Sequence, residues 1–268
     1  KKMTKIISVI DLFAGPGGLS EGFSAFKNST GHPFKVRLSI EKDSIAYQTL
    51  FLRNFVRQFP PHSVPSEYYQ YLRKEIVKDE LYKKYAEQAS QAASETWCAE
   101  LGSKNFPHKL VDERIEKALE NPKPKKWILI GGPPCQAYSL VGRSRMKGLK
   151  KYKNDKRHFL YREYLRIIAQ HKPPVFVMEN VKGLLSSTVK GENIFQRIIS
   201  DLRDPYAALE INKGPSLLYK IYSLVTPVDD PEMHEPEDFI SESEKYGITQ
   251  ARHRVIMLGT RTDLEVRP

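Results

Sequence analysis

The chain has 268 residues, of which 40% are hydrophobic and 28% are charged. These values are ordinary for a folded globular protein and exclude a disordered chain. The length predicts one large α/β domain, with or without a small appendage, rather than two full domains. Because no apolar stretch approaches the roughly 20 residues of a membrane span, we expect a cytoplasmic protein with no membrane partner.

Charge and cysteine content narrow the function further. A net charge of +11 favours a polyanionic partner, since Lys and Arg side chains that neutralise phosphates release counterions. Cys98 and Cys135 are too few for a disulfide framework or for a zinc site with four ligands, so we expect no structural metal. Cys98 lies between Trp97 and Ala99, a setting typical of a small buried hydrophobic side chain.

The N-terminal part of the chain predicts alternating strands and helices. Residues 6–13 form a buried strand that runs into a glycine-rich turn at 14–18 and then a helix to about residue 26. A second strand at 36–40 is followed by a helix from Ser44. This alternation predicts a parallel sheet with crossover helices.

The pattern loosens between residues 54 and 126. A stretch rich in Tyr, Lys and Glu at 67–93 predicts a helical insertion that packs on the domain without joining its sheet. A third strand is expected at 97–101, and apolar residues spaced four apart predict a helix at 111–119.

The C-terminal half returns to strands and helices. The predicted elements are a strand at 127–130, a helix at 159–170, a strand at 175–178, a helix at 194–202, and strands at 217–225 and 255–258. Between the first two, residues 142–157 hold eight Lys and Arg side chains against the single Asp155. Such a run predicts a solvated loop.

The segment Asp11-Leu12-Phe13-Ala14-Gly15-Pro16-Gly17-Gly18 places glycines where a strand turns into a helix. A ligand can approach the backbone there because no Cβ intervenes. Glu41 ends the next predicted strand, close to the spacing of about 20 residues at which an acid binds ribose hydroxyls. The pair favours an adenosine-containing cofactor over a plain structural corner, although Ser20 replaces the third glycine of the strict motif.

Other chemically active residues follow predicted strands. Cys135 comes after two glycines and two prolines, which give the thiol a stiff backbone, and Glu179 and Asn180 follow an apolar strand. Taken singly, Cys135 has the simpler interpretation of an inert buried thiol, and Glu179 that of a carboxylate that caps a helix or turn. Because the ends of parallel strands share one edge of a sheet, Glu41, Cys135 and Glu179 are predicted to lie together. Gln250, Arg252 and Arg254 alternate ahead of an apolar strand and point to one face if that strand begins early.

Four segments in this order resemble the motif set of the DNA cytosine-5 methyltransferases. They are residues 11–18, Gly132-Pro133-Pro134-Cys135-Gln136, Glu179-Asn180-Val181 and Gln250-x-Arg252-x-Arg254. The resemblance implies a Rossmann-like S-adenosylmethionine-dependent methyltransferase fold, with a mostly parallel sheet and a helical insertion. It also implies methyl transfer to C5 of cytosine in duplex DNA through a covalent adduct of cysteine with C6, as in bacterial modification enzymes.

The resemblance assigns roles to five catalytic residues. Cys135 would add to C6 of a cytosine flipped out of the duplex. Glu179 would hydrogen-bond N3 and the exocyclic amine and protonate N3 as the adduct forms. Arg254 would contact the base carbonyl and Arg252 would lie near the nucleophile, while Asn180 would brace the Pro134–Cys135 turn.

The resemblance also assigns a cofactor site for S-adenosylmethionine, which leaves as S-adenosylhomocysteine. Phe13 would stack on adenine, and Glu41 would bind the ribose. The turn beside the methionine part comprises Ala14, Gly15, Pro16, Gly17 and Gly18, and the remaining lining comprises Lys42, Pro134 and Leu160. The family usually has an acid after the third strand that binds the adenine amine, and Glu100 is the candidate here. Residues 142–157 resemble the family's mobile catalytic loop, which would contact phosphates.

We expect residues 1–268 to form a catalytic domain without the family's C-terminal target recognition region, which would lie on the same or another chain. A cognate restriction endonuclease and, in a bacterium, a nucleoid-associated location are further expectations. The alternatives are a tRNA cytosine-5 methyltransferase of the same family and a catalytically idle DNA-binding module. A nicotinamide dehydrogenase is disfavoured by Cys135 and by the missing third glycine.

Overall fold

The first half of the chain builds parallel strands joined by helices. The computed structural model describes residues 6–60, 62–120, 126–134, 157–189, 191–211 and 217–264. Its first elements are β1 (Ile7–Leu12), α1 (Gly18–Ala25), β2 (Phe34–Glu41) and α2 (Ser44–Val56). β1 is almost wholly buried, as expected of a central parallel strand. α2 begins where the Asp43 carboxylate accepts the amide hydrogens of Ile45 and Ala46, which fixes its first turn.

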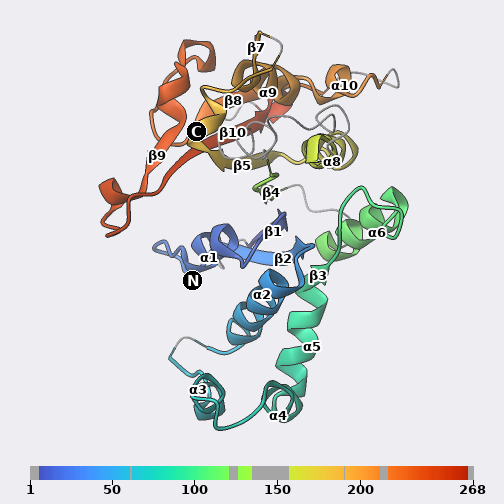
Figure 1. Ribbon diagram of the computed structural model, residues 1–268, viewed down its shortest axis with the longest axis vertical. Helices are drawn as coiled ribbons and strands as arrows, with labels where there is room; N and C mark the ends of the chain where they lie inside the picture. The colour runs from blue at the N-terminus through green and yellow to red at the C-terminus, as the bar shows by residue number, and fades with distance from the viewer. Residues whose placement is uncertain are drawn as a thin grey trace, which may run out of the picture.

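A small helical unit separates α2 from the third strand. It consists of α3 (Ser66–Leu72), α4 (Lys78–Lys84) and α5 (Ala86–Glu95), and α5 leads directly into β3 (Thr96–Cys98). Phe55 of α2, Leu81 of α4 and Ala92 of α5 form its own small core. Figure 1 shows α2 and α5 running from the sheet toward α3 and α4 at the bottom of the molecule. The insertion expected at 67–93 corresponds to these three helices.

The remaining elements complete the sheet and cover it. The helices are α6 (His108–Leu119), α8 (Arg157–His171), α9 (Ile194–Arg203) and α10 (Pro205–Ala208). The strands are β4 (Trp127–Gly131), β5 (Val175–Val181), β8 (Tyr219–Ser223), β9 (Ile240–Glu242) and β10 (His253–Arg261). β6 (Thr188–Val189) and β7 (Glu192–Asn193) pair only with each other.

Among the described residues, eight strands form one sheet in the order β3-β2-β1-β4-β5-β10-β8, with β9 paired to β10. Neighbours from β3 to β5 are parallel, whereas β10 runs antiparallel to β5, β8 and β9. The expected α/β fold with a mostly parallel sheet is therefore confirmed. The strand order reverses between β1 and β4, and ligands of open α/β sheets bind beside such a switch point.

The two faces of the sheet carry separate hydrophobic clusters, as the alternation of side chains along a strand requires. On one face, Ile10, Leu129 and Phe176 pack with residues of α6, α8 and α9. On the other face, Val9, Ile130 and Val177 pack with Leu19 and Phe23 of α1. Gly259 of β10 lies opposite Phe176 of β5, and the ring occupies the space that a side chain at 259 would need.

Several predicted boundaries are wrong by a few residues. β3 ends at Cys98 instead of residue 101, and β8 is shorter than the expected strand at 217–225. β5 and β10 extend beyond the predicted 175–178 and 255–258, because each provides hydrogen-bonding partners for the other along its full length. Glu179 and Asn180 therefore belong to β5 rather than following it.

Candidate active site

The turn after β1 is a strained, open backbone. Phe13 has φ 56°, and Gly15 and Gly17 have φ 55° and 87°, so every second residue adopts the left-handed conformation. An aromatic residue in that region is uncommon and is kept there only by surrounding contacts. The amide of Ala14 donates to the Ile40 carbonyl at 3.0 Å, which ties the turn to β2. A Cβ added at Gly15 would meet no heavy atom within 4 Å, so the turn leaves room for a ligand.

Glu41 joins this turn to the start of α2. Its Oε2 accepts the Gly15 amide hydrogen and its Oε1 accepts that of Asp43, both at 2.7 Å. A carboxylate oxygen has two acceptor positions, so each oxygen keeps one for a further donor such as a ribose hydroxyl. The arrangement fits the ribose-binding role expected of Glu41. It also makes Glu41 the link between the glycine turn and the start of α2.

The ends of β2 and β3 form the next part of the site. Lys42 Nζ lies 3.5 Å from Glu100 Oε1, with both side chains about half exposed. Glu100 follows β3 closely and is available at this edge for the adenine role. The expectation that Cys98 is buried is wrong, because β3 ends at this residue and the thiol is exposed beside the Lys42 carbonyl.

The end of β4 approaches two neighbouring elements closely. A Cβ added at Gly131 would lie 2.7 Å from the Leu12 carbonyl oxygen and 2.9 Å from the Tyr164 ring, so β4 needs glycine to pass between them. Asn180 Nδ2 donates to the Pro133 carbonyl at 3.2 Å, a contact of the kind expected for bracing this turn. Cys135, Gln136 and residues 142–156 lie outside the described residues.

Glu179 and Arg254 form an ion pair across β5 and β10. Arg254 Nε lies 2.7 Å from Glu179 Oε1, and Arg254 Nη1 donates to the His253 carbonyl at 2.7 Å. A Cβ added at Gly132 would lie 3.1 Å from Glu179 Oε2, so Gly132 leaves space for this carboxylate. The pair holds the carboxylate toward the end of β4, where the backbone continues to Cys135.

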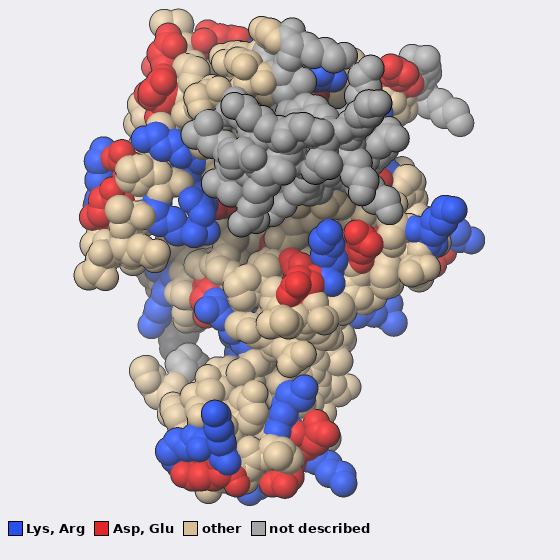
Figure 2. Space-filling view, in the orientation of Figure 1, with Lys and Arg blue, Asp and Glu red and all other residues tan. Residues whose placement is uncertain are grey.

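The alignment of Gln250, Arg252 and Arg254 on one strand face required a strand that begins before His253, and the structure does not meet this condition. β10 begins at His253, so Gln250 and Arg252 lie in the connection from β9. The Ser243 hydroxyl donates to the Gln250 carbonyl at 2.6 Å and accepts the Arg252 amide hydrogen at 2.9 Å, which closes this connection into a loop. Lys and Arg side chains gather around β9 on the left of Figure 2.

Leu160 and Phe13 are two further residues predicted to line the cofactor site. Leu160 lies in the first turn of α8 and is 6% exposed, and Phe13 is half-buried against the cluster that contains Ile10, Leu129 and Phe176. Tyr164, one turn further along α8, donates its hydroxyl to the Val177 carbonyl at 3.1 Å and fixes α8 against β5. Phe13 follows the last residue of β1, and Glu41 is the last residue of the neighbouring parallel strand β2, so these two predicted cofactor residues lie at one edge of the sheet.

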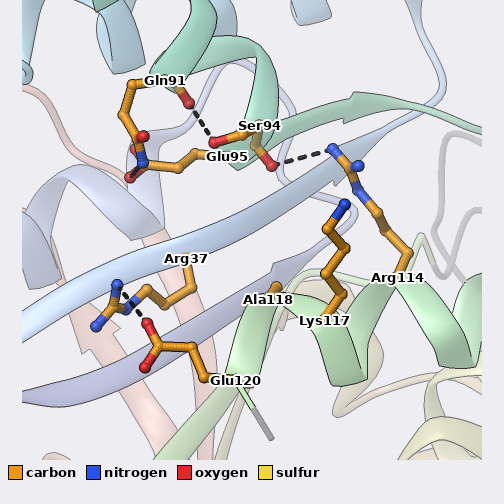
Figure 3. A pocket seen from close by; sticks show the side chains of 8 residues that line it. All are labelled: Arg37, Gln91, Ser94, Glu95, Arg114, Lys117, Ala118 and Glu120. Carbon is orange, nitrogen blue, oxygen red and sulfur yellow. Dashed lines mark hydrogen bonds and ion pairs between the residues drawn. The ribbon is translucent and has the colours of Figure 1, made fainter.

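A cavity of about 220 Å³ at the opposite edge is lined by Arg37, Arg114, Lys117 and Glu120 among others (Figure 3). Arg114 Nη2 donates to the Ser94 carbonyl at 3.0 Å, and Arg37 Nη1 lies 3.2 Å from Glu120 Oε1. The carbonyl ends of α5 and α6 meet here, and helix C-termini attract positive side chains. The positively charged side chains that line this cavity are therefore explained by the two helix ends, and they do not indicate a ligand.

Two features are absent from the described parts of the chain. No cluster of three or more His, Cys, Asp or Glu side chains suited to a metal ion occurs there. No helix in those parts is long and apolar enough to cross a membrane.

Solved structures place this fold among the methyltransferases. The chain aligns over 98% of its length with 49% of a structure described as a DNA modification methyltransferase encoded within a prophage (E. coli), with a TM-score of 0.52. Sequence identity is 19%, so this likeness concerns the fold alone. The expected methyltransferase fold class is confirmed.

The family follows from sequence comparison. The model for C-5 cytosine-specific DNA methylases matches residues 81–205. The chain is 31% identical over 264 residues to Type II methyltransferase M.Bpa9945I of Bacillus paralicheniformis, covering 94% of this chain and 53% of that protein. It is 27% identical over 260 residues to M.BspRI of Lysinibacillus sphaericus, covering 96% and 45%. The family model and both relatives therefore agree with the motif resemblance to the C-5 cytosine-specific DNA methylases.

Two consequences bear on function. Similarity to a methyltransferase family implies a methyl donor of the S-adenosylmethionine type and does not favour a nicotinamide dehydrogenase. The chain spans about half the length of the curated relatives that it matches over most of its sequence.

Proposed function

We propose that this chain carries the catalytic region of an enzyme that methylates C5 of cytosine in duplex DNA, with S-adenosylmethionine as methyl donor. The Glu179–Arg254 pair carries the proposal, because it holds the carboxylate beside Gly132, three residues before Cys135 in the sequence. A carboxyl group and a thiol that serve one site suit nucleophilic addition to a base with proton transfer to its ring.

The glycine turn and Glu41 fit the methyl donor. The turn is open at Gly15, and both Glu41 oxygens keep an acceptor position. Phe13, Lys42, Pro134 and Leu160 would complete the site, and Glu100 would bind the adenine amine. When bound there, S-adenosylmethionine supplies an electrophilic methyl group on a positively charged sulfur.

The proposed chemistry on the base uses the chain's own residues. The Cys135 thiolate adds to C6 of a flipped cytosine, and Glu179, which enters this step as the carboxylic acid, gives its proton to N3 and becomes the carboxylate that pairs with Arg254, so that negative charge does not build up on the ring. The addition turns C5 into a nucleophilic carbon. After methylation, water takes the C5 proton, Cys135 leaves as thiolate, and N3 returns its proton to the Glu179 carboxylate, which restores the aromatic ring.

The supporting residues orient the acid and the nucleophile. Arg254 fixes Glu179 through a single 2.7 Å contact and keeps donors for the base carbonyl. Asn180 holds the Pro133 carbonyl and so sets the direction in which the chain leaves β4. Arg252 would lie near the nucleophile, with its position set by the Ser243 hydroxyl.

Duplex DNA with 5-fluorocytosine at the target should form a covalent adduct with this chain at Cys135, because fluorine cannot leave as a proton does. Peptide mapping by mass spectrometry locates the adduct. Cys98→Ser is the matched control: its thiol is exposed at the end of β3, so it tests whether any accessible thiol suffices. We expect this variant to form the adduct normally.

Parallel reactions with duplex DNA and tRNA test the substrate class. Adduct formation on tRNA and none on DNA would replace the proposal with a tRNA methyltransferase. An adduct at Cys98, or none on either nucleic acid in the presence of S-adenosylmethionine, would contradict the proposed chemistry.

DNA binding by this chain should weaken steeply with salt, because a net charge of +11 favours contacts to phosphates. Phosphate contacts carry no sequence information, so specific and scrambled duplexes should bind with similar affinity. Fluorescence anisotropy at two salt concentrations measures both effects. Strong sequence preference by these residues alone would show that base readout lies within them.

A further inference from the structure

A buried polar cluster lies beneath the glycine turn. Asp11, at the end of β1, is 1% exposed, and Ser39 is its register partner on β2. Partners in neighbouring parallel strands project to the same side of a sheet, and this is the side on which α1 packs. Ser20 of α1 is also fully buried, and its hydroxyl donates to the Gly17 carbonyl at 3.2 Å. The cluster is therefore one layer below the proposed methyl-donor site.

The polar atoms of this cluster are unsatisfied. Neither carboxyl oxygen of Asp11 has a hydrogen-bond partner of good geometry in the described parts of the chain. The Ser39 hydroxyl has none there either. An isolated buried carboxylate is costly, so such a group takes up a proton unless a positive charge lies nearby. Burial raises the pKa of Asp11 from 3.8 to about 7.

The groups that face Asp11 come from every element around it. The Ser20 hydroxyl of α1 and the Arg57 guanidinium of α2 lower the pKa of Asp11, whereas the Glu41 carboxylate of β2 raises it. Tyr164 of α8 is buried and its pKa lies well above the usual value, so it stays neutral. Arg57 is already paired with Glu21 at 3.7 Å and donates to Ser24 Oγ at 2.9 Å, so it is only partly available to Asp11.

We propose, on the basis of the proposed function, that Asp11 gives up its proton when a positively charged methyl donor binds at the glycine turn, and so favours the charged donor over its uncharged thioether product. The physical reason is electrostatic. A positive charge above the turn stabilises the Asp11 carboxylate, and by linkage the carboxylate strengthens binding of that charge by the same factor. S-adenosylmethionine carries the sulfonium charge, whereas S-adenosylhomocysteine does not.

Glu41 cannot replace Asp11 in this role. Its two oxygens already accept the Gly15 and Asp43 amide hydrogens, so Glu41 has the hydrogen-bond partners that Asp11 lacks. Asp11 is instead unpartnered and poised to change its protonation state near neutral pH. Asp11 is thus a positioning residue: in the proposal it stabilises the positive charge of the methyl donor and does not contact the base.

Isothermal titration calorimetry of the chain with S-adenosylmethionine, in two buffers of different ionisation enthalpy, measures the proton release. Between pH 5.5 and 7 we expect an average release of about half to two thirds of a proton and an affinity gain of about five- to tenfold, since a tenfold gain over 1.5 pH units corresponds to about two thirds of a proton. This range lies below the pKa of about 7.7–8.0 of an α-amino group, so the donor's own amine does not interfere. S-adenosylhomocysteine should show less than half of both effects.

Asp11→Asn should abolish the proton release and the pH dependence. Asp43→Asn is the matched control, because it removes an exposed carboxylate nearby while Asn caps a helix equally well. That variant should keep the wild-type proton release. Equal proton release for both ligands, or release that persists in Asp11→Asn, would overturn the proposal. Failure of both ligands to bind would instead overturn the proposed function.

Thermal unfolding of ligand-free protein gives a second, independent readout. A carboxyl whose pKa is raised on folding contributes stability below its unfolded pKa of 3.8 and loses that contribution as the pH rises through about 7. The melting temperature of Asp11→Asn should therefore be close to that of wild type at pH 4 and several degrees higher at pH 8. Curves that stay parallel across this range would show that Asp11 remains ionised and would also overturn the proposal.

Discussion

Glu179→Gln should slow adduct formation by about 10²- to 10⁴-fold, the range expected for loss of a general acid. Glutamine keeps the size of the side chain and can still hydrogen-bond the base. It cannot deliver a proton to N3, and it replaces the 2.7 Å ion pair with Arg254 by a weaker neutral contact. Rapid-quench measurement with 5-fluorocytosine DNA gives the rate of adduct formation separately from later steps.

Glu244→Gln is the matched control for this variant. Glu244 also pairs with a basic side chain, His253 at 2.6 Å, but it lies in the exposed loop before β10. We expect it to keep the wild-type rate. If Glu179→Gln kept it as well, Glu179 would not be the acid.

Gly259→Ala should destabilise the fold by about 3 kcal/mol or more, at the upper end of the cost of overpacking a core. A Cβ at this position would lie 2.1 to 2.6 Å from three atoms of the Phe176 ring. The ring cannot move aside easily, because it also packs against Tyr164 and Tyr219 with ring centroids 6.3 Å and 5.1 Å away. Urea unfolding followed by circular dichroism measures the loss.

Two further variants test the cause. Gly22→Ala in α1 should be neutral or stabilising by up to about 1 kcal/mol, since its Cβ would meet no heavy atom within 4 Å and alanine favours helix. Adding Phe176→Leu to Gly259→Ala should restore part of the lost stability, because the two positions are in direct contact. Additive losses in the double variant would show that the two side chains do not clash.

The elements nearest the site were the most predictable from sequence. β1, the glycine turn and the start of α2 follow from local signals: an apolar run, glycines at a turn, and Asp43 ahead of Ser44 as a helix cap. The order of the four motifs predicted the family because each motif is a short stretch whose residues act together. The placement of Glu41 beside Gly15 followed from the rule that parallel strands end at one edge.

Contacts between distant segments could not be predicted in this way. The sequence places Arg254 in a basic stretch and Glu179 at the end of an apolar one, but only the antiparallel pairing of β10 with β5 brings them within 2.7 Å. The exposure of Cys98 depends on where β3 stops, and the edge position of a strand is not a local property. The loop that removes Arg252 from the strand face depends on the Ser243 hydroxyl nine residues away.

The sequence by itself determined the alternating strands and helices, the glycine turn and the family, because these depend on residue type, period and spacing within short windows. The tertiary structure decided the Glu179–Arg254 pair, the fit of Phe176 over Gly259 and the burial of Asp11 without a partner. The physical reason is that burial and pairing energies are set by which segments become neighbours in space. A carboxyl such as that of Asp11 has an ordinary pKa in the unfolded chain and a raised one only after β2 and α1 have excluded water from it.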